Sequence, residues 1–185
     1  EIIVGIIGGS SITREVTPTG YAPATNQWLT AASLTGNEWL RPSVAVVGDL
    51  MYVLGGFGDV SSPRGAQARV MTLNLINDVW TTTGIANMGT KRDNMSAIVL
   101  NGKIYALGGN PVGNCAGVNC VVGAEYRSAE VYDPATNTWA PIASMFTARK
   151  NFDSVVLNGQ IYVIGGRGGG QYLGAMERYT PPAAP

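Results

Sequence analysis

The sequence predicts an all-β protein built as a repeat of small antiparallel sheets. Four apolar runs along the chain each end in a pair of glycines, at residues 8–9, 55–56, 108–109 and 165–166. The second glycines of successive pairs lie 47, 53 and 57 residues apart. Self-similarity at a period of this size, in segments rich in β-branched residues, indicates a repeat architecture.

The best-ordered repeat covers residues 97 to 145 and predicts four strands, which we name A to D in chain order. These strands span residues 97–100, 103–107, 129–132 and 138–141. Asn101-Gly102 separates strands A and B and is the dipeptide most typical of a tight hairpin. Pro141 is consistent with an outermost strand D, because an edge strand tolerates proline.

The other repeats follow the same order, and their lengths differ in one loop only. The distance from the strand D tryptophan to the second glycine of the next repeat is 28, 29 or 27 residues. The distance from that glycine to the tryptophan of its own repeat varies more, at 19, 24 and 30 residues. The variable part is therefore the loop between strands B and C. A constant scaffold beside a variable loop is typical of binding proteins.

A double glycine followed by a tyrosine and a tryptophan at loosely fixed distances resembles the Kelch repeat, over essentially the whole chain. The resemblance implies a Kelch-type β-propeller, in which each four-stranded unit forms one blade. The matching structural residues are the four glycine pairs, Tyr21, Tyr132, Tyr179, Trp28, Trp80 and Trp139. We expect each tryptophan to fill the wedge between adjacent blades. Leu73 replaces the strand C tyrosine of the second blade, which is expected to pack less well.

The predicted ring is incomplete. The chain opens in a strand B and closes in a strand C, which gives 14 strands or about three and a half blades, whereas propellers use ~4–8 blades. Because open sheet edges invite aggregation, we expect further chain or another copy to complete the ring. Residues 1–180 are the predicted propeller segment, and residues 181–185, which contain only proline and alanine, are a predicted linker or tail.

Composition excludes several classes of function. A formal net charge of zero argues against a nucleic-acid partner, and no apolar run approaches the ~20 residues that span a membrane. The chain has no histidine. This excludes both a Ser-His-Asp triad and the imidazole-bound copper of the oxidases that resemble Kelch propellers. We therefore expect no cofactor and no metal.

The two cysteines predict a disulfide. Cys115 and Cys120 are separated by four residues, one of them a glycine, so the chain can bend and bring the two sulfurs together. A zinc site would need further thiolate or imidazole ligands, which the sequence lacks. Two unpaired thiols are the alternative. A disulfide would place the protein in an oxidising compartment, so the expected location is extracellular or periplasmic.

The predicted ligand-binding residues lie on one rim of the propeller. Because strands alternate in direction, the B–C and D–A loops emerge together. These loops carry six candidates: Arg41, Lys91, Arg92, Arg149, Lys150 and Arg167. The opposite rim carries mainly aspartates, so the loop rim should be basic and attract anions. Arg92 and Arg149 occupy the same position in successive repeats, which favours an alternative in which each pairs with a neighbouring blade.

These features predict a non-catalytic binding module of a secreted or cell-surface protein. Its expected ligand is a protein or a carbohydrate, bound by the rim with the B–C and D–A loops. One alternative is a sugar-metabolising propeller enzyme of the sialic-acid epimerase or glycosidase type, with carboxylates such as Glu38 and Asp59 as candidate groups. Another alternative is a structural assembly subunit whose open blade edges make the contacts.

Overall fold

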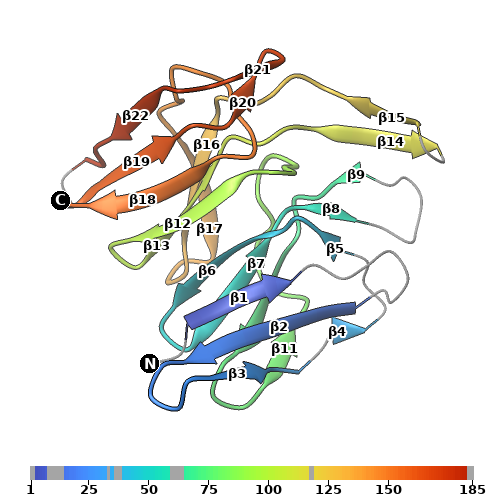
Figure 1. The fold of residues 1–185 in the computed structure, drawn as a ribbon, viewed down its shortest axis with the longest axis vertical. Coiled ribbons are helices and arrows are strands. Elements are labelled where there is room, and N and C mark those ends of the chain that lie inside the picture. Colours follow the sequence, from blue (N-terminus) through green and yellow to red (C-terminus); the bar gives the residue numbers. More distant parts are fainter. Residues whose placement is uncertain are drawn as a thin grey trace.

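The computed structural model describes residues 3–7, 15–32, 34–35, 39–58, 65–116 and 119–182. These residues form antiparallel sheets that follow one another along the chain as successive blades of a β-propeller (Figure 1). No helix in these ranges is long and apolar enough to cross a membrane. The predicted all-β propeller fold is confirmed, and the ring is a partial one.

Four sheets correspond to the four predicted blades. Blade 1 contains β1 (Ile3–Ile7), β2 (Glu15–Ala22) and β3 (Gln27–Thr30), and β4 (Leu34–Thr35) also pairs with β2. Blade 2 contains β6 (Ser43–Val47), β7 (Leu50–Leu54), β10 (Val70–Asn74) and β11 (Val79–Thr81). Blade 3 contains β12 (Ser96–Leu100), β13 (Lys103–Leu107), β16 (Ala129–Asp133) and β17 (Thr138–Ile142). Blade 4 contains β18 (Asp153–Leu157), β19 (Gln160–Ile164) and β22 (Met176–Tyr179).

The Asn-Gly turns form because both of their residues adopt positive φ. Asn101 and Gly102 have φ of 52° and 72°, and Asn158 and Gly159 repeat these values at 51° and 71°. Two consecutive residues at positive φ produce the turn whose twist matches the flanking strands. The turns therefore set the A–B register in blades 3 and 4, with Leu100 opposite Lys103 in the former.

The loops carry short strands that the sequence did not predict. These strands are β5 (Trp39–Leu40), β8 (Phe57–Gly58), β9 (Gly65–Ala66), β14 (Val112–Ala116), β15 (Asn119–Val122), β20 (Arg167–Gly168) and β21 (Gln171–Tyr172). They form one three-stranded sheet and two hairpins, drawn at the ends of the blade strands in Figure 1. Most of them lie in B–C loops. We name the B–C and D–A loops together the loop face.

The core lies between the blades. Successive side chains of a strand point to opposite faces of its sheet, so each central strand contributes to two clusters. Ile104 and Ala106 of β13 pack with Tyr52 and Leu54 of blade 2. The alternate β13 residues, Tyr105 and Leu107, instead join a cluster that contains Ile161 and Val163 of blade 4. Leu73 is fully buried in a further cluster of blade 2, so the poorer packing expected there is not observed.

The glycine pair of blade 3 lies against the loop that leads into blade 4. Gly108 and Gly109 have φ of 57° and 86°, a region that favours glycine. A Cβ on Gly108 would lie 2.6 Å from the carbonyl oxygen of Arg149, in the loop that leads into blade 4. The Gly109 amide donates to that same oxygen at 2.9 Å. The pair therefore removes side-chain bulk and supplies an amide where two blades meet.

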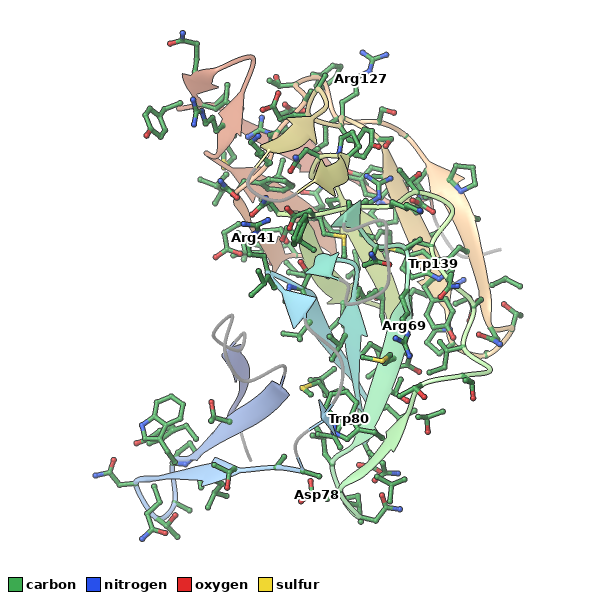
Figure 2. All side chains as sticks on the ribbon, turned by 90° about the vertical axis from the view of Figure 1, so that its right-hand side faces the viewer. Arg41, Arg69, Asp78, Trp80, Arg127 and Trp139 are labelled. Atoms are coloured by element: carbon green, nitrogen blue, oxygen red, sulfur yellow. The ribbon has the colours of Figure 1, made fainter. Side chains whose placement is uncertain are left out.

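Two of the three strand D tryptophans pack as expected and one does not. Trp80 and Trp139 are half-buried, and their indole nitrogens donate to the carbonyls of Ala32 and Ala86, in the D–A loop before each blade (Figure 2). Trp28 stacks on Tyr21 but is 72% exposed, so its expected burial is wrong.

Candidate functional site

The candidate site is the loop face, because main-chain bridges gather its loops into one surface. Main-chain bridges join Gln67 to Arg92, Asp93 to Asn110 and Lys150 to Arg167. Each bridge pairs a B–C loop with a D–A loop. The two loop types therefore lie side by side on one rim, as the alternating strand directions predict.

Arg92 is a buried structural residue of this face. Its side chain has no exposed surface, and its Nε and Nη2 donate to Glu130 Oε1 at 3.1 and 2.9 Å. Nη1 donates to the carbonyls of Gly108 and Ser128 at 2.7 and 3.0 Å. The ring of Tyr126 lies 5.4 Å from the guanidinium carbon. These contacts fasten the D–A loop to strands B and C of blade 3.

Arg149 repeats this arrangement in blade 4. Its Nη2 donates to Glu177 Oε1 at 2.6 Å, and Nη1 donates to the carbonyls of Gly165 and Ala175. Its side chain is also fully buried. Burial acts to raise the pKa of the Glu177 carboxyl, but hydrogen bonds from two loop amides and from Arg149 outweigh it and lower that pKa. Every described contact of Arg92 and Arg149 is therefore internal to the protein.

Arg41 is at the surface and has an unusual backbone conformation. Its guanidinium makes two hydrogen bonds to Asp93, at 3.1 and 2.7 Å, and lies 5.5 Å from the centre of the Phe57 ring (Figure 2). The Arg41 side chain is 51% exposed, whereas that of Asp93 is buried. The φ of Arg41 is 54°. Asn94 and Asn151 occupy the same position in the next two repeats and have φ of 54° and 51°. Asparagine tolerates this region, whereas most residues are strained there.

Lys150 and Arg167 lie together at the blade 4 end of the face. Lys150 Nζ forms an ion pair with Glu125 Oε1 at 3.1 Å. The pKa of the Glu125 carboxyl is lowered, chiefly by its own main-chain amide, with help from Lys150 and against the effect of burial. Arg167 lies over the ring of Tyr172, with 5.9 Å from its guanidinium carbon to the ring centre. Tyr172 is 90% exposed, so this pair is presented to solvent.

The basic excess expected on this face is largely neutralised. Arg41, Arg92, Arg149 and Lys150 each pair with a carboxylate. Lys91 and Arg167 are exposed, and no ion pair of either is found among the described side chains. The attraction of the face for anions is therefore weaker than a count of its cations predicts.

Glu130 and Glu177 are important residues of this region that the sequence analysis missed. Each accepts two main-chain amides of a D–A loop: Gly89 and Thr90 for Glu130, and Phe146 and Thr147 for Glu177. A signal for them is present in the sequence. Both carboxylates stand two residues before a strand C tyrosine, in Glu-x-Tyr. Their repetition parallels that of the two arginines.

The predicted disulfide is not supported. The main chains of Cys115 and Cys120 lie in β14 and β15, but their side chains are outside the described residues. Glu38 and Asp59, the carboxylates considered for an enzyme, also lie outside them. Within the described ranges no group of three or more potential metal ligands is found.

The family comparison identifies Kelch motifs at residues 114–146 and 148–182. Kelch-like protein terF of Aspergillus terreus is 34% identical over 82% of this chain and 33% of its own length. Kelch-like protein 23 of Homo sapiens is 33% identical over 80% of this chain and 24% of its own. Spermatocyte protein spe-26 of Caenorhabditis elegans is 29% identical over 87% of this chain and 27% of its own. The chain thus spans about a quarter to a third of these relatives.

The solved structure of YjhT superimposes with a TM-score of 0.72 and 16% identity, over 90% of this chain and 50% of that one. This likeness concerns the fold, and it agrees with a propeller of which the chain supplies part. The relatives also correct one expectation. Kelch-like proteins are intracellular, so the extracellular or periplasmic location inferred from the cysteines is wrong.

Proposed function

The chain belongs to the Kelch-repeat family, and from this premise we propose that it is a protein-interaction module that binds its partner with the loop face. The observation that carries the proposal is the division of the repeat into a constant and a variable part. The blade strands keep their spacing, whereas the B–C loops differ in length and bear their own short sheets. Such a division is typical of loops that bind on a rigid scaffold.

The side chains exposed on this face support a protein partner. Tyr172 and Phe146 are 90% and 88% exposed, and Arg167 lies over the Tyr172 ring. Exposed aromatic and arginine side chains are the types that contribute most to protein interfaces. Arg41, held by Asp93, and Lys91 add charge at the same rim. A carbohydrate or an anionic ligand stays a prediction that no described contact tests.

Site-specific photocrosslinking tests the use of this face. A photoreactive phenylalanine derivative replaces Tyr172 in one variant and Ile76 in another, and both are mixed with extract from cells that make the protein. Ile76 is the matched control, because it is 77% exposed and lies on the opposite rim, in the C–D turn of blade 2. We expect discrete protein adducts from position 172 only, competed away by unlabelled wild-type protein. Equal adducts from both positions, or none from position 172, would show that the loop face is not the surface that binds the partner.

A further inference from the structure

Arg41 has a main-chain conformation that favours asparagine, yet the chain places a long, charged side chain there. Its φ is 54°, and the equivalent residues of the next two blades are Asn94 and Asn151. Asparagine adopts this region because its short side chain can hydrogen-bond locally, whereas arginine is strained there. Strain at a single residue is typical of sites that hold a ligand. The conformation of Arg41 therefore directs attention to its side chain.

The guanidinium of Arg41 is fixed from two directions. Its Nε and Nη2 donate to the Asp93 carboxylate at 3.1 and 2.7 Å, and Asn94 Nδ2 donates to the same carboxylate at 2.9 Å. Leu40 pairs with Phe57 across β5 and β8, and the Phe57 ring lies 5.5 Å from the guanidinium carbon. The group thus has a defined orientation before any partner binds, which lowers the entropic cost of binding.

One face of this guanidinium is available to a partner. Phe57 lies on the other face, and the Arg41 side chain is still 51% exposed. Figure 2 places Arg41 at the margin of the molecule. No acceptor for its Nη1 is found among the described residues. A flat cation of this kind can stack on an aromatic ring and donate to a main-chain carbonyl at its edge.

A carboxylate ligand fits the same position less well. Asp93 already occupies two donors of the guanidinium, and its side chain is buried. A second carboxylate at the guanidinium would lie close to the first, and like charges placed together at an interface are costly. An aromatic side chain adds no charge, so the buried carboxylate does not oppose it.

We propose that Arg41 anchors a docking site for a tryptophan or tyrosine side chain of the protein partner. The partner's ring stacks on the outer face of the guanidinium, so that Arg41 lies between this ring and Phe57. Tryptophan, tyrosine and arginine are the side chains that dominate protein interfaces, and they tend to pair across them. The site names the partner chemistry of the loop face, and it rests on the function proposed above.

NMR of the ¹⁵N-labelled 185-residue protein tests the site with defined probes. The Arg41 Nε–H signal is suited to this test because its proton is hydrogen-bonded to Asp93. The probe is the capped tripeptide Gly-Trp-Gly, and capped Gly-Glu-Gly and Gly-Leu-Gly are its controls. We expect a saturable upfield shift of this signal with the tryptophan peptide only, because a proton that faces an aromatic ring is shielded.

A double variant tests the role of the arginine. Arg41→Asn with Asp93→Asn removes both charges of the pair and restores at position 41 the asparagine of the next two repeats. The Phe57 amide signal, which both proteins keep, measures the affinity for the tryptophan peptide. We expect that affinity to fall on the order of fivefold, the effect of an exposed cation–π contact. Arg127→Asn, at another exposed arginine of the loop face, is the matched control and should leave the affinity unchanged.

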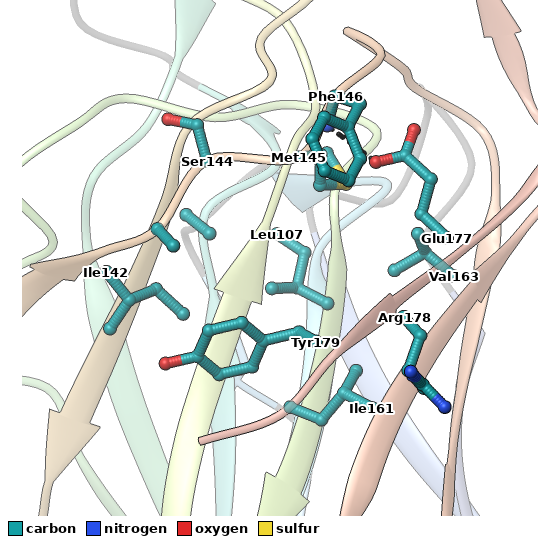
Figure 3. A pocket seen from close by; sticks show the side chains of 12 residues that line it. Leu107, Ile142, Ser144, Met145, Phe146, Ile161, Val163, Glu177, Arg178 and Tyr179 are labelled. Carbon is teal, nitrogen blue, oxygen red and sulfur yellow. Dashed lines mark hydrogen bonds between the residues drawn. The ribbon is translucent and has the colours of Figure 1, made fainter. Parts of the chain in front are cut away.

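The same samples show whether the peptide binds elsewhere. An apolar cavity of about 150 Å³ lies between blades 3 and 4, and Ile142, Ile161 and Val163 line it beside the Tyr179 ring (Figure 3). Methyl shifts of these residues without a shift at Arg41 would overturn the proposal. So would an equal response to the glutamate peptide, or no response to any peptide. Photocrosslinking at position 172 can succeed in each of these cases, so failure of this site is distinguishable from failure of the loop face.

Discussion

The buried pair of arginine and glutamate is the residue-level device that holds each D–A loop. The pair recurs in two successive blades, as Arg92 with Glu130 and as Arg149 with Glu177. Each arginine also donates to the carbonyl of the equivalent glycine, Gly108 or Gly165. Blade 2 has neither charge. Trp39 stands at the position of the arginine, and Met71 stands at the position of the glutamate. Joint replacement is what electrostatics requires, because one buried charge without its partner is costly.

Removing one charge of the pair should therefore destabilise the protein strongly. Glu130→Gln keeps the shape of the side chain but leaves the Arg92 guanidinium buried without a counter-charge. We expect the free energy of unfolding to fall by about 3 kcal/mol, measured by urea denaturation. The control is Asp133→Asn, which breaks the solvent-exposed pair with Lys103 and should cost much less, because exposed pairs contribute little. Equal losses in the two variants would contradict a special role for burial.

At the scale of elements, the second glycine at the end of strand B packs closely against the loop that leads into its own blade. Gly109 and Gly102 both have positive φ, at 86° and 72°. Their surroundings differ. A Cβ on Gly109 would lie 2.7 Å from the Asp93 carbonyl oxygen and 3.0 Å from Met95 Cβ, whereas a Cβ on Gly102 would meet no atom within 4 Å. The two positions therefore separate the cost of the conformation from the cost of the contact.

Gly102→Ala should lower the free energy of unfolding by about 1 kcal/mol, the cost of the left-handed conformation alone. Gly109→Ala adds a steric clash and should lower it by roughly a further 2 kcal/mol, as overpacking does in a core. Urea midpoints of the two variants, measured side by side, give the difference directly. If the two losses are equal, close packing against Asp93 and Met95 does not explain the second glycine.

The strands of the blades were predictable from the sequence, and the loop strands were not. Strand B of the third repeat was predicted at 103–107, the bounds of β13, because alternation and the Asn-Gly turn are local signals. β8 and β9 contain two residues each, too few to show a period. The burial of Arg92 depends on Glu130, 38 residues away. The repeated position of Arg92 and Arg149 indicated a structural pairing, and the repeated Glu-x-Tyr could have indicated the partner.

At the scale of the whole molecule, the blades differ in how completely their neighbours cover them. Blade 3 packs against blade 2 on one face and blade 4 on the other. Blade 4 has apolar side chains exposed on the face turned away from blade 3: Val155 45%, Leu157 56%, Ile164 46% and Met176 61%. The aligned Leu100, Leu107 and Ala129 of blade 3 are at most 6% exposed. In a repeat array each unit gains stability from its interfaces, so blade 4 should open more readily.

Amide hydrogen exchange measures this difference at matched positions. Ile104 and Ala106 of β13 align with Ile161 and Val163 of β19, and each strand is paired on both sides. Hydrogen bonding alone therefore predicts equal protection. The missing apolar interface should lower the opening free energy of blade 4, so we expect its amides to exchange at least about tenfold faster, a difference of about 1.4 kcal/mol. Equal protection of β13 and β19 would mean that the blades open as one cooperative unit, with no weaker end.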